Sequence, residues 1–148
     1  MIGQIACGGN SVVASGSEGV IISSNSGTNW TVVREDLHLD YIIYGDIIEK
    51  YLGWKPFNQT VWSSNDEGKT WKKHIVGPFG PNVSFRSAAT GEEAWIMVGT
   101  NVIISNGDNL DEWSEVLPAQ QGSVYPGVAS INTPQGSIYV LLQVCFFF

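Results

Sequence analysis

The residues of this sequence that could carry out acid–base chemistry are carboxylates, and they are scattered. A glycoside hydrolase needs two carboxyl groups that face each other across a cleft, one of them as a general acid. The acidic residues in expected loops and at strand ends are Asp36, Asp40, Asp46, Glu49, Glu92 and Glu93. Nothing in their spacing singles out a pair. We therefore expect these side chains to keep the surface soluble, and we assign no catalytic residue.

Residues that ligate metals do not form a convincing cluster either. His38 and His74 lie far apart and have no Cys or carboxylate at ligand spacing, so we do not expect a zinc site. Asp108, Asp111 and Glu112 could in principle hold Ca²⁺. A degenerate turn with solvated acidic side chains is the favoured interpretation. We predict neither a metal ion nor a cofactor.

Aromatic residues are the better indication of a binding function. One irregular segment contains Tyr41, Tyr44, Tyr51, Trp54 and Phe57. Aromatic faces bring a large, rigid contact area to sugars and proteins. For the segment as a whole the favoured interpretation is that alternate members face the core, with Trp54 and Phe57 at the surface because Lys55-Pro56 marks a loop. The candidate binding surface comprises Tyr44, Trp54, Phe57 and Arg86.

The composition restricts the classes of partner. The chain has 148 residues and a net charge of −7, and only 14% of its residues are charged, against about 25% in typical soluble domains. Nucleic-acid binding needs clustered Lys and Arg, and an anionic membrane surface needs the same. We expect neither partner. The apolar C-terminal segment, residues 138–148, is too short to span a bilayer, so we expect no membrane insertion.

The pattern of the sequence predicts strands. Short apolar or alternating runs are bounded by Gly, Asn, Ser and Pro, and no stretch has a helical period. The expected strands are 4–7, 11–15, 20–23, 30–34, 38–44, 50–54, 60–63, 71–76, 83–89, 94–98, 102–105, 113–117, 124–131 and 137–144. Cys7 and Cys145 lie in two of the apolar runs. We expect them to be buried free thiols, with a disulfide as the alternative.

A motif recurs with a fixed period. Residues 64–71 read S-x-D-x-G-x-T-W, and the motif residues are Ser64, Asp66, Gly68, Thr70 and Trp71. A weaker copy upstream keeps Ser23, Asn25, Gly27 and Trp30, and a degenerate copy downstream keeps Ser105 and Trp113. The tryptophans are 41 and 42 residues apart. A period in the low forties is typical of units of four strands.

The motif has a local physical purpose. It falls at the expected hairpin between the third and fourth strands of each unit. Its Asp or Asn can accept hydrogen bonds from the backbone of its own turn, and its Gly can adopt a positive φ. The Trp is large enough to cover the turn and fill the gap to a neighbouring sheet.

This motif resembles the Asp-box, or bacterial neuraminidase repeat, which occurs in sialidases and in many non-sialidase β-propellers, including photosystem II assembly factors. The resemblance covers about residues 4–117. It implies an all-β, propeller-like array of about three and a half four-stranded antiparallel blades. We expect one domain over residues 1–148, with blades at about 1–35, 36–77 and 78–118 and a partial blade at 119–148. In that family the box is a structural turn away from the ligand-binding face.

The resemblance also implies a test of sialidase activity. Sialidases grip the substrate carboxylate with three arginines, because guanidinium groups bind carboxylates bidentately. This chain has only Arg34 and Arg86. Arg34 begins a Glu-Asp loop and is expected to form a solvated ion pair. A triad cannot be assembled within one copy, so we do not expect a sialidase.

The number of predicted blades is small for a closed ring, since propellers close with four to eight. We expect a protein partner or a second copy to complete or cap the array. The alternatives are that the chain is a fragment of a longer propeller, or that it closes as an unusually small one. The predicted function is a non-catalytic β-propeller module for binding or scaffolding, in a virion, phage tail or extracellular setting. The alternative is a carbohydrate-binding module or a fragment of a sialidase-like glycoside hydrolase.

Overall fold

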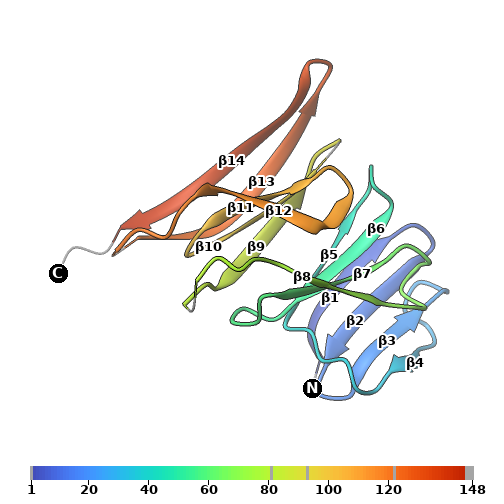
Figure 1. The fold of residues 1–148 in the computed structure, drawn as a ribbon. Helices are drawn as coiled ribbons and strands as arrows, with labels where there is room; N and C mark the ends of the chain where they lie inside the picture. The colour runs from blue at the N-terminus through green and yellow to red at the C-terminus, as the bar shows by residue number, and fades with distance from the viewer. Residues whose placement is uncertain (1, 81, 93, 122, 146–148) are drawn as a thin grey trace. The chain divides into compact units, whose positions relative to one another are not determined.

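Every regular element in the described part of the chain is a β-strand. The computed structural model describes residues 2–80, 82–92, 94–121 and 123–145, and Figure 1 shows the strands in chain order. Glu93 and Phe146–Phe148 lie outside the described residues. The described residues contain no helix that is long and apolar enough to cross a membrane. The prediction of an all-β chain is therefore confirmed.

Three sheets of four antiparallel strands account for most of the chain, and each follows the chain from one edge to the other. The first contains β1 (Ile2–Gly8), β2 (Ser11–Gly16), β3 (Gly19–Ser23) and β4 (Thr31–Arg34). The second contains β5 (Tyr41–Gly45), β6 (Lys50–Trp54), β7 (Thr60–Ser64) and β8 (Lys72–Ile75). The third contains β9 (Phe85–Thr90), β10 (Trp95–Gly99), β11 (Val102–Asn106) and β12 (Asn109–Leu117).

A shorter sheet follows these three. It contains only β13 (Ser123–Thr133) and β14 (Gly136–Cys145), which pair in antiparallel register around the turn at 134–135. The strand content is therefore that of three propeller-like blades and half of a fourth, as the repeat predicts.

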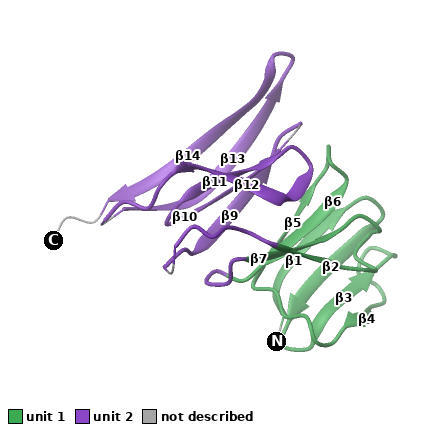
Figure 2. Cartoon of the chain, in the orientation of Figure 1, with its two compact units in different colours: residues 1–55, 60–74 green, residues 56–59, 75–148 purple. Residues whose placement is uncertain are grey.

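The strands form two compact units, which Figure 2 shows in different colours. Unit 1 comprises residues 1–55 and 60–74, and unit 2 comprises 56–59 and 75–148. The expectation of a single domain over the whole chain stays a prediction.

Each unit has a core of its own. In unit 1 the first two blades pack on each other through Val13, Val20, Ile42, Tyr51 and Trp71. In unit 2 the third blade packs against β13 and β14 through Val98, Val102, Tyr125, Tyr139 and Leu141. Burial of these apolar faces provides the main stabilisation, since a single four-stranded sheet cannot cover both of its own faces.

Two strands begin three or more residues away from their expected first residue, each because of a contact made from outside the strand. The segment before Tyr41 was expected to be strand from His38 onward, but the amide of Leu39 donates to the hydroxyl of Ser15. The strand expected from Trp113 begins earlier, at Asn109, because Asn106 pairs with Asn109 across a tight turn.

The cysteine environments differ from the prediction. Both thiols are free, but both Cys7 and Cys145 are exposed rather than buried. The reason lies in the alternation of side chains along a strand. In β1 it is Ala6 that packs against the core of unit 1, so its neighbour Cys7 points away. In β14 it is Leu141 that packs inward, so Cys145 lies beyond the covered part of the strand.

Candidate functional site

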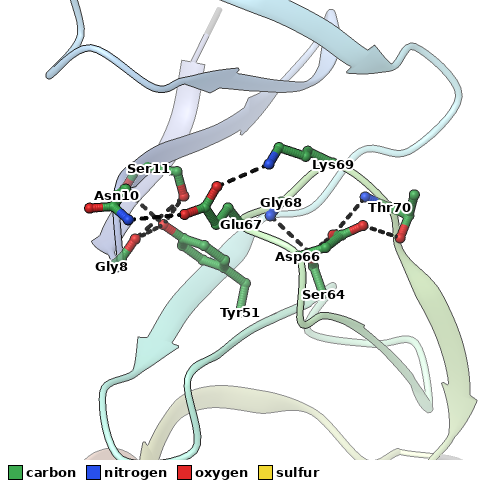
Figure 3. A network of polar contacts seen from close by, with 10 residues as sticks. All are labelled: Gly8, Asn10, Ser11, Tyr51, Ser64, Asp66, Glu67, Gly68, Lys69 and Thr70. Atoms are coloured by element: carbon green, nitrogen blue, oxygen red, sulfur yellow. Dashed lines mark hydrogen bonds and ion pairs between the residues drawn. The ribbon is translucent and has the colours of Figure 1, made fainter.

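The second hairpin motif is a closed network of hydrogen bonds between β7 and β8, part of which Figure 3 shows. The hydroxyl of Ser64 donates to Asp66 Oδ1 over 2.8 Å and accepts from the amide of Gly68 over 2.9 Å. The carboxylate of Asp66 also accepts from the amide of Thr70 over 2.9 Å and from its hydroxyl over 2.6 Å. The indole of Trp71 donates to the carbonyl of Gly68. The motif's polar groups are thus directed into its own turn.

The first hairpin repeats this geometry between β3 and β4 with an amide in place of the carboxylate. Ser23 donates to Asn25 Oδ1 over 2.9 Å and accepts from the amide of Gly27. Asn25 Oδ1 also accepts from the amide of Asn29 over 2.8 Å. The indole of Trp30 donates to Gly27. The turn therefore forms with either Asp or Asn at this position.

The third hairpin has a different structure. The hydroxyl of Ser105 donates to the carbonyl of Gly107, and it accepts from the amide of Trp95 in the neighbouring strand. The amide of Asn106 donates to Glu112 over 2.6 Å. Only the indole bond persists, from Trp113 to the carbonyl of Leu110 over 2.8 Å.

The three tryptophans differ in burial although their indole bonds are alike. Trp71 is 7% exposed and lies in the core of unit 1, whereas Trp30 is 38% exposed. Trp113 is half-buried. The expectation that each Trp fills a gap to a neighbouring sheet thus holds for Trp71 and is wrong for Trp30. The reason is that the second hairpin lies against the first blade, with Gly68 beside Val13.

One buried polar group, the Tyr51 hydroxyl, is not among the predicted site residues, and Figure 3 shows it near the second hairpin. The hydroxyl of Tyr51 lies 2.9 Å from the hydroxyl of Ser11 and within 3.0 Å of the carbonyl oxygens of Gly8 and Ser11. This contact joins β6 of the second blade to the turn after β1 of the first. Burial raises the pKa of Tyr51, and the hydrogen bonds of Ser11 and Gly8 partly oppose that rise. A signal in the sequence was the Gly8-Gly9-Asn10-Ser11 turn, whose carbonyls need donors.

Removal of that hydroxyl should weaken the packing of the first two blades. We expect Tyr51→Phe to lower the free energy of unfolding by about 1–3 kcal/mol, because the buried acceptors lose their partner. Urea denaturation measures this change. Tyr41→Phe is a suitable control because Tyr41 is only half-buried. Equal losses for the two variants would contradict a special role for the Tyr51 hydroxyl.

The motif carboxylate should make stability depend on acid. Burial of Asp66 would raise its pKa, but hydrogen bonds from Thr70 and Ser64 outweigh burial and hold the pKa below 3.8. The folded state therefore gains stability from Asp66 above its unfolded pKa. That gain is lost as the pH falls below the unfolded pKa and through the lower folded pKa.

Asp66→Asn tests this pH dependence. The variant should keep the turn, as Asn25 does, and should show a shallower loss of Tm on acidification. The reciprocal change Asn25→Asp should make that loss steeper. Unchanged acid profiles in both variants would contradict the role assigned to the carboxylate.

The candidate binding surface is only partly exposed. Trp54 is 1% exposed and stacks on Tyr41 with ring centroids 5.2 Å apart, so its expected place at the surface is wrong. It is the last residue of β6 and faces inward, and the loop begins only after it. Tyr44 is half-buried and contacts the ring of Tyr51. Phe57 is 80% exposed and Arg86 is exposed on β9. Tyr44 and Trp54 belong to unit 1, and Phe57 and Arg86 belong to unit 2.

The side chains of Arg34 and of the two histidines, which were considered as candidates for binding or metal ligation, form hydrogen bonds with neighbouring protein groups. Arg34 binds Asp36 bidentately over 2.7 and 2.8 Å and lies over the ring of Trp62, which confirms the expected exposed ion pair. The Arg34 hydrogen bond lowers the pKa of Asp36. His38 contacts the carbonyl of Gly16, and His74 contacts the hydroxyl of Ser63. Among the described residues no group of three His, Cys, Asp or Glu side chains could hold a metal ion.

Unit 2 contains two open pockets that sequence reasoning did not identify. One, of about 430 Å³, lies beside the third hairpin and is lined by Ile75, Asn106, Asp111, Glu112 and Trp113, among others. The other, of about 460 Å³, lies beside the β13–β14 turn and is lined by Glu92, Ile104, Gln135 and Tyr139, among others. Both have the volume of small-ligand sites.

Comparisons with known proteins identify no family. No protein-family model matches the chain, and no curated protein matches it. Among solved structures, the chain is similar to the crystal structure of an ancestral GH74 enzyme, with a TM-score of 0.47 and 10% sequence identity. The alignment covers 88% of this chain and 27% of that one, so the chain spans about a quarter of that structure's length. The resemblance to the Asp-box family stays a prediction carried by the motif residues.

Proposed function

We propose that this chain is a non-catalytic, propeller-type module that binds or scaffolds other proteins through the outer face of its β13–β14 sheet. The observation that carries the proposal is an exposed, uncharged apolar face on this sheet. One face of the sheet contributes Tyr125, Tyr139 and Leu141 to the core of unit 2. The opposite face exposes Ile131, Ile138, Val140, Leu142 and Val144, each between 38% and 61% exposed.

The exposed residues form a continuous surface because the strand register brings them together. Ile131 pairs with Ile138, Ala129 with Val140, and Val124 with Val144. In β14 the exposed residues alternate with inward-facing ones, so the strand is apolar on both faces. Contiguous exposed apolar patches on soluble proteins mark interaction sites.

The absence of charge strengthens this interpretation. No Asp, Glu, Lys or Arg occurs in residues 116–148. Solvent-facing sheets usually carry charged residues that discourage association. A sheet without them is suited to burial against another protein, because no ionic group must be dehydrated.

The expected absence of catalysis is part of the proposal. Arg34 is engaged by Asp36, which leaves Arg86 as the other arginine of the sequence. The described acidic candidates Asp36, Asp40, Asp46, Glu49 and Glu92 are all exposed. A general acid for glycoside cleavage has its pKa raised by burial in an apolar pocket, and these exposed carboxylates lack such surroundings.

Two measurements test the proposed function. A photo-crosslinking residue at position 142, introduced in the native host, should give one discrete adduct that is lost when Ile138→Asp is added. The same residue at position 18, in an exposed turn, should give none. Adducts that are equally diverse at both positions would contradict the proposal. So would robust turnover of fluorogenic sialosides or neutral glycosides by the purified chain.

A carbohydrate-binding module is the second candidate, and the pocket beside the third hairpin favours it. Trp113 offers an aromatic surface, and Asn106, Asp111 and Glu112 offer polar groups for hydroxyls. Since unit 2 contains a single basic residue, Arg86, we propose that a bound sugar would be neutral rather than acidic. A glycan array tests this, with Glu112→Ala expected to reduce binding and Glu67→Ala as the matched change in the second hairpin. Retention of acidic glycans alone would contradict it.

We also propose a virion or phage-tail setting for the module, with an extracellular setting as the alternative. Fractionation of host cultures, with detection of the chain in purified particles, tests this setting. Recovery of the chain only from the host cytoplasm would contradict it.

A further inference from the structure

We propose that the outer edge of β14 pairs with β14 of a second copy of this chain, which completes a four-stranded antiparallel sheet. This inference rests on the proposed function, since it names a partner for the β13–β14 sheet. It concerns the strand edge rather than the apolar face, and the two can be tested separately.

The position of β14 in its sheet identifies the edge that is built for pairing. In each complete blade the second strand has the first strand on one side and the third on the other, as in β1-β2-β3-β4. Both edges of β2 are paired in this way, because Val13 pairs with Ala6 of β1 and with Ile22 of β3. β14 is the second strand of its sheet, and among the described residues it pairs with β13 alone. The edge of β14 that faces away from β13 therefore corresponds to the edge at which β2, β6 and β10 pair with the third strand of their blades.

The residues of β14 make its edge more suitable for pairing than the edge of β13. β14 has ten residues, Gly136–Cys145, without proline, which corresponds to a length of about 33 Å. β13 contains Pro126, which cannot donate a backbone hydrogen bond, and its register shifts between Val124 and Gly127. β14 also lacks the Lys, Pro and inward charges that protect natural edge strands from association.

The charge distribution favours a second copy at this place. The chain has a net charge of −7, so two copies repel each other on approach. The stretch 116–148 lacks charged residues, and pairing through it brings no like charges into contact. The acidic residues nearest in sequence, Glu112 and Glu115, belong to β12 in another sheet.

The symmetry of the pairing is closed. Two copies of one strand that pair in antiparallel orientation are related by a twofold axis, which gives a dimer rather than an open polymer. The strand order becomes β13-β14-β14-β13. This sheet has the same number of strands and the same orientation as the other three. Backbone donors and acceptors along β14 would then be satisfied within the sheet.

The mass of the full chain in solution tests this pairing. Light scattering across a concentration series should give twice the chain mass of 16.1 kDa. Val140→Glu should weaken association at least about tenfold, because like charges on adjacent strands repel across the dyad. Val140→Thr should retain the dimer, and matched thermal melts show whether each variant is folded. Hydrogen exchange should show protection of β14 that rises with concentration.

Ile131→Glu is the control that distinguishes association through the edge of β14 from association through the apolar face of the β13–β14 sheet. Its side chain is 56% exposed, close to the 54% of Val140, and lies on the same face but on β13. The edge pairing predicts that this variant stays dimeric. A monomer at all concentrations overturns the inference, and the crosslink at position 142 then decides the proposed function independently. Loss of the dimer in both Glu variants also overturns it, because association would then use the face.

Discussion

Trp71→Ala is expected to lower the free energy of unfolding by about 3–5 kcal/mol, as for other buried Trp or Phe residues replaced by Ala. The side chain is 7% exposed and packs with Val13, Val20 and Tyr51, whose ring centroid lies 6.4 Å away. Its removal leaves a cavity between the first two blades. It also deprives the carbonyl of Gly68 of the indole donor. Urea denaturation followed by circular dichroism measures the loss.

Trp30→Ala is the matched control for this prediction. Trp30 occupies the same position of the first hairpin and makes the same indole bond, to Gly27, but it is 38% exposed. We expect its loss to cost about 0.5–1.5 kcal/mol, the value of one hydrogen bond. A cost within about 0.5 kcal/mol for Trp71→Ala, as at a surface site, would show that Trp71 does not hold the blades together.

Gly68→Ala should be the second most damaging change, with a cost of about 2–5 kcal/mol. Gly68 has a φ of +89°, and a left-handed conformation costs other residues about 1–2 kcal/mol. A Cβ atom would also lie 2.5 Å from Val13 Cγ2 and 3.1 Å from Ile22 Cγ2. Forcing an extra carbon into packed surroundings costs about 1–3 kcal/mol more.

The first hairpin again supplies the control. Gly27 has a φ of +84°, but the nearest atom to an added Cβ is Trp30 Cζ2, at an uncrowded 3.8 Å. Gly27→Ala should therefore cost only the conformational term, about 1–2 kcal/mol. The difference between the two variants in the free energy of unfolding isolates the contact with Val13. Equal costs would mean that the second hairpin is not packed on the first blade.

The strands could be predicted from the sequence because their limits are set by neighbouring residues. The strand at Lys50–Trp54 has the predicted limits, and β2, β3 and β7 differ from prediction by one residue at an end. Turns at Gly8-Gly9 and Gly19 end the apolar runs directly. The first residues of β5 and β12 could not be predicted, because the hydroxyl of Ser15 and the pairing with Asn106 of β11 act from outside these strands.

The predicted binding residues show where such reasoning fails. Lys55-Pro56 correctly marks a loop, and Phe57 in that loop is exposed. Trp54 stands one residue before the loop and is buried, because residues 51–54 of β6 are covered on both faces and Trp54 stacks on Tyr41. The pocket beside the third hairpin was missed for a related reason. It combines Ile75 with residues 105–114, and sequence spacing does not bring these together.

The sequence by itself determined the all-β class, the approximate position of most strands and the position of the first two hairpins. These follow from short-range effects: alternation of side chains, glycines that adopt positive φ, and the Ser, Asp and Asn side chains that bind their own turn. Only the tertiary structure decided that Trp71 is buried while Trp30 is exposed, and that Cys7 and Cys145 face solvent. Burial depends on which sheet lies opposite a side chain. The motif tryptophan is therefore expected to contribute more to the free energy of unfolding in the second hairpin than in the first. Trp71 of the second hairpin packs against the first blade, whereas Trp30 of the first hairpin is partly exposed to solvent.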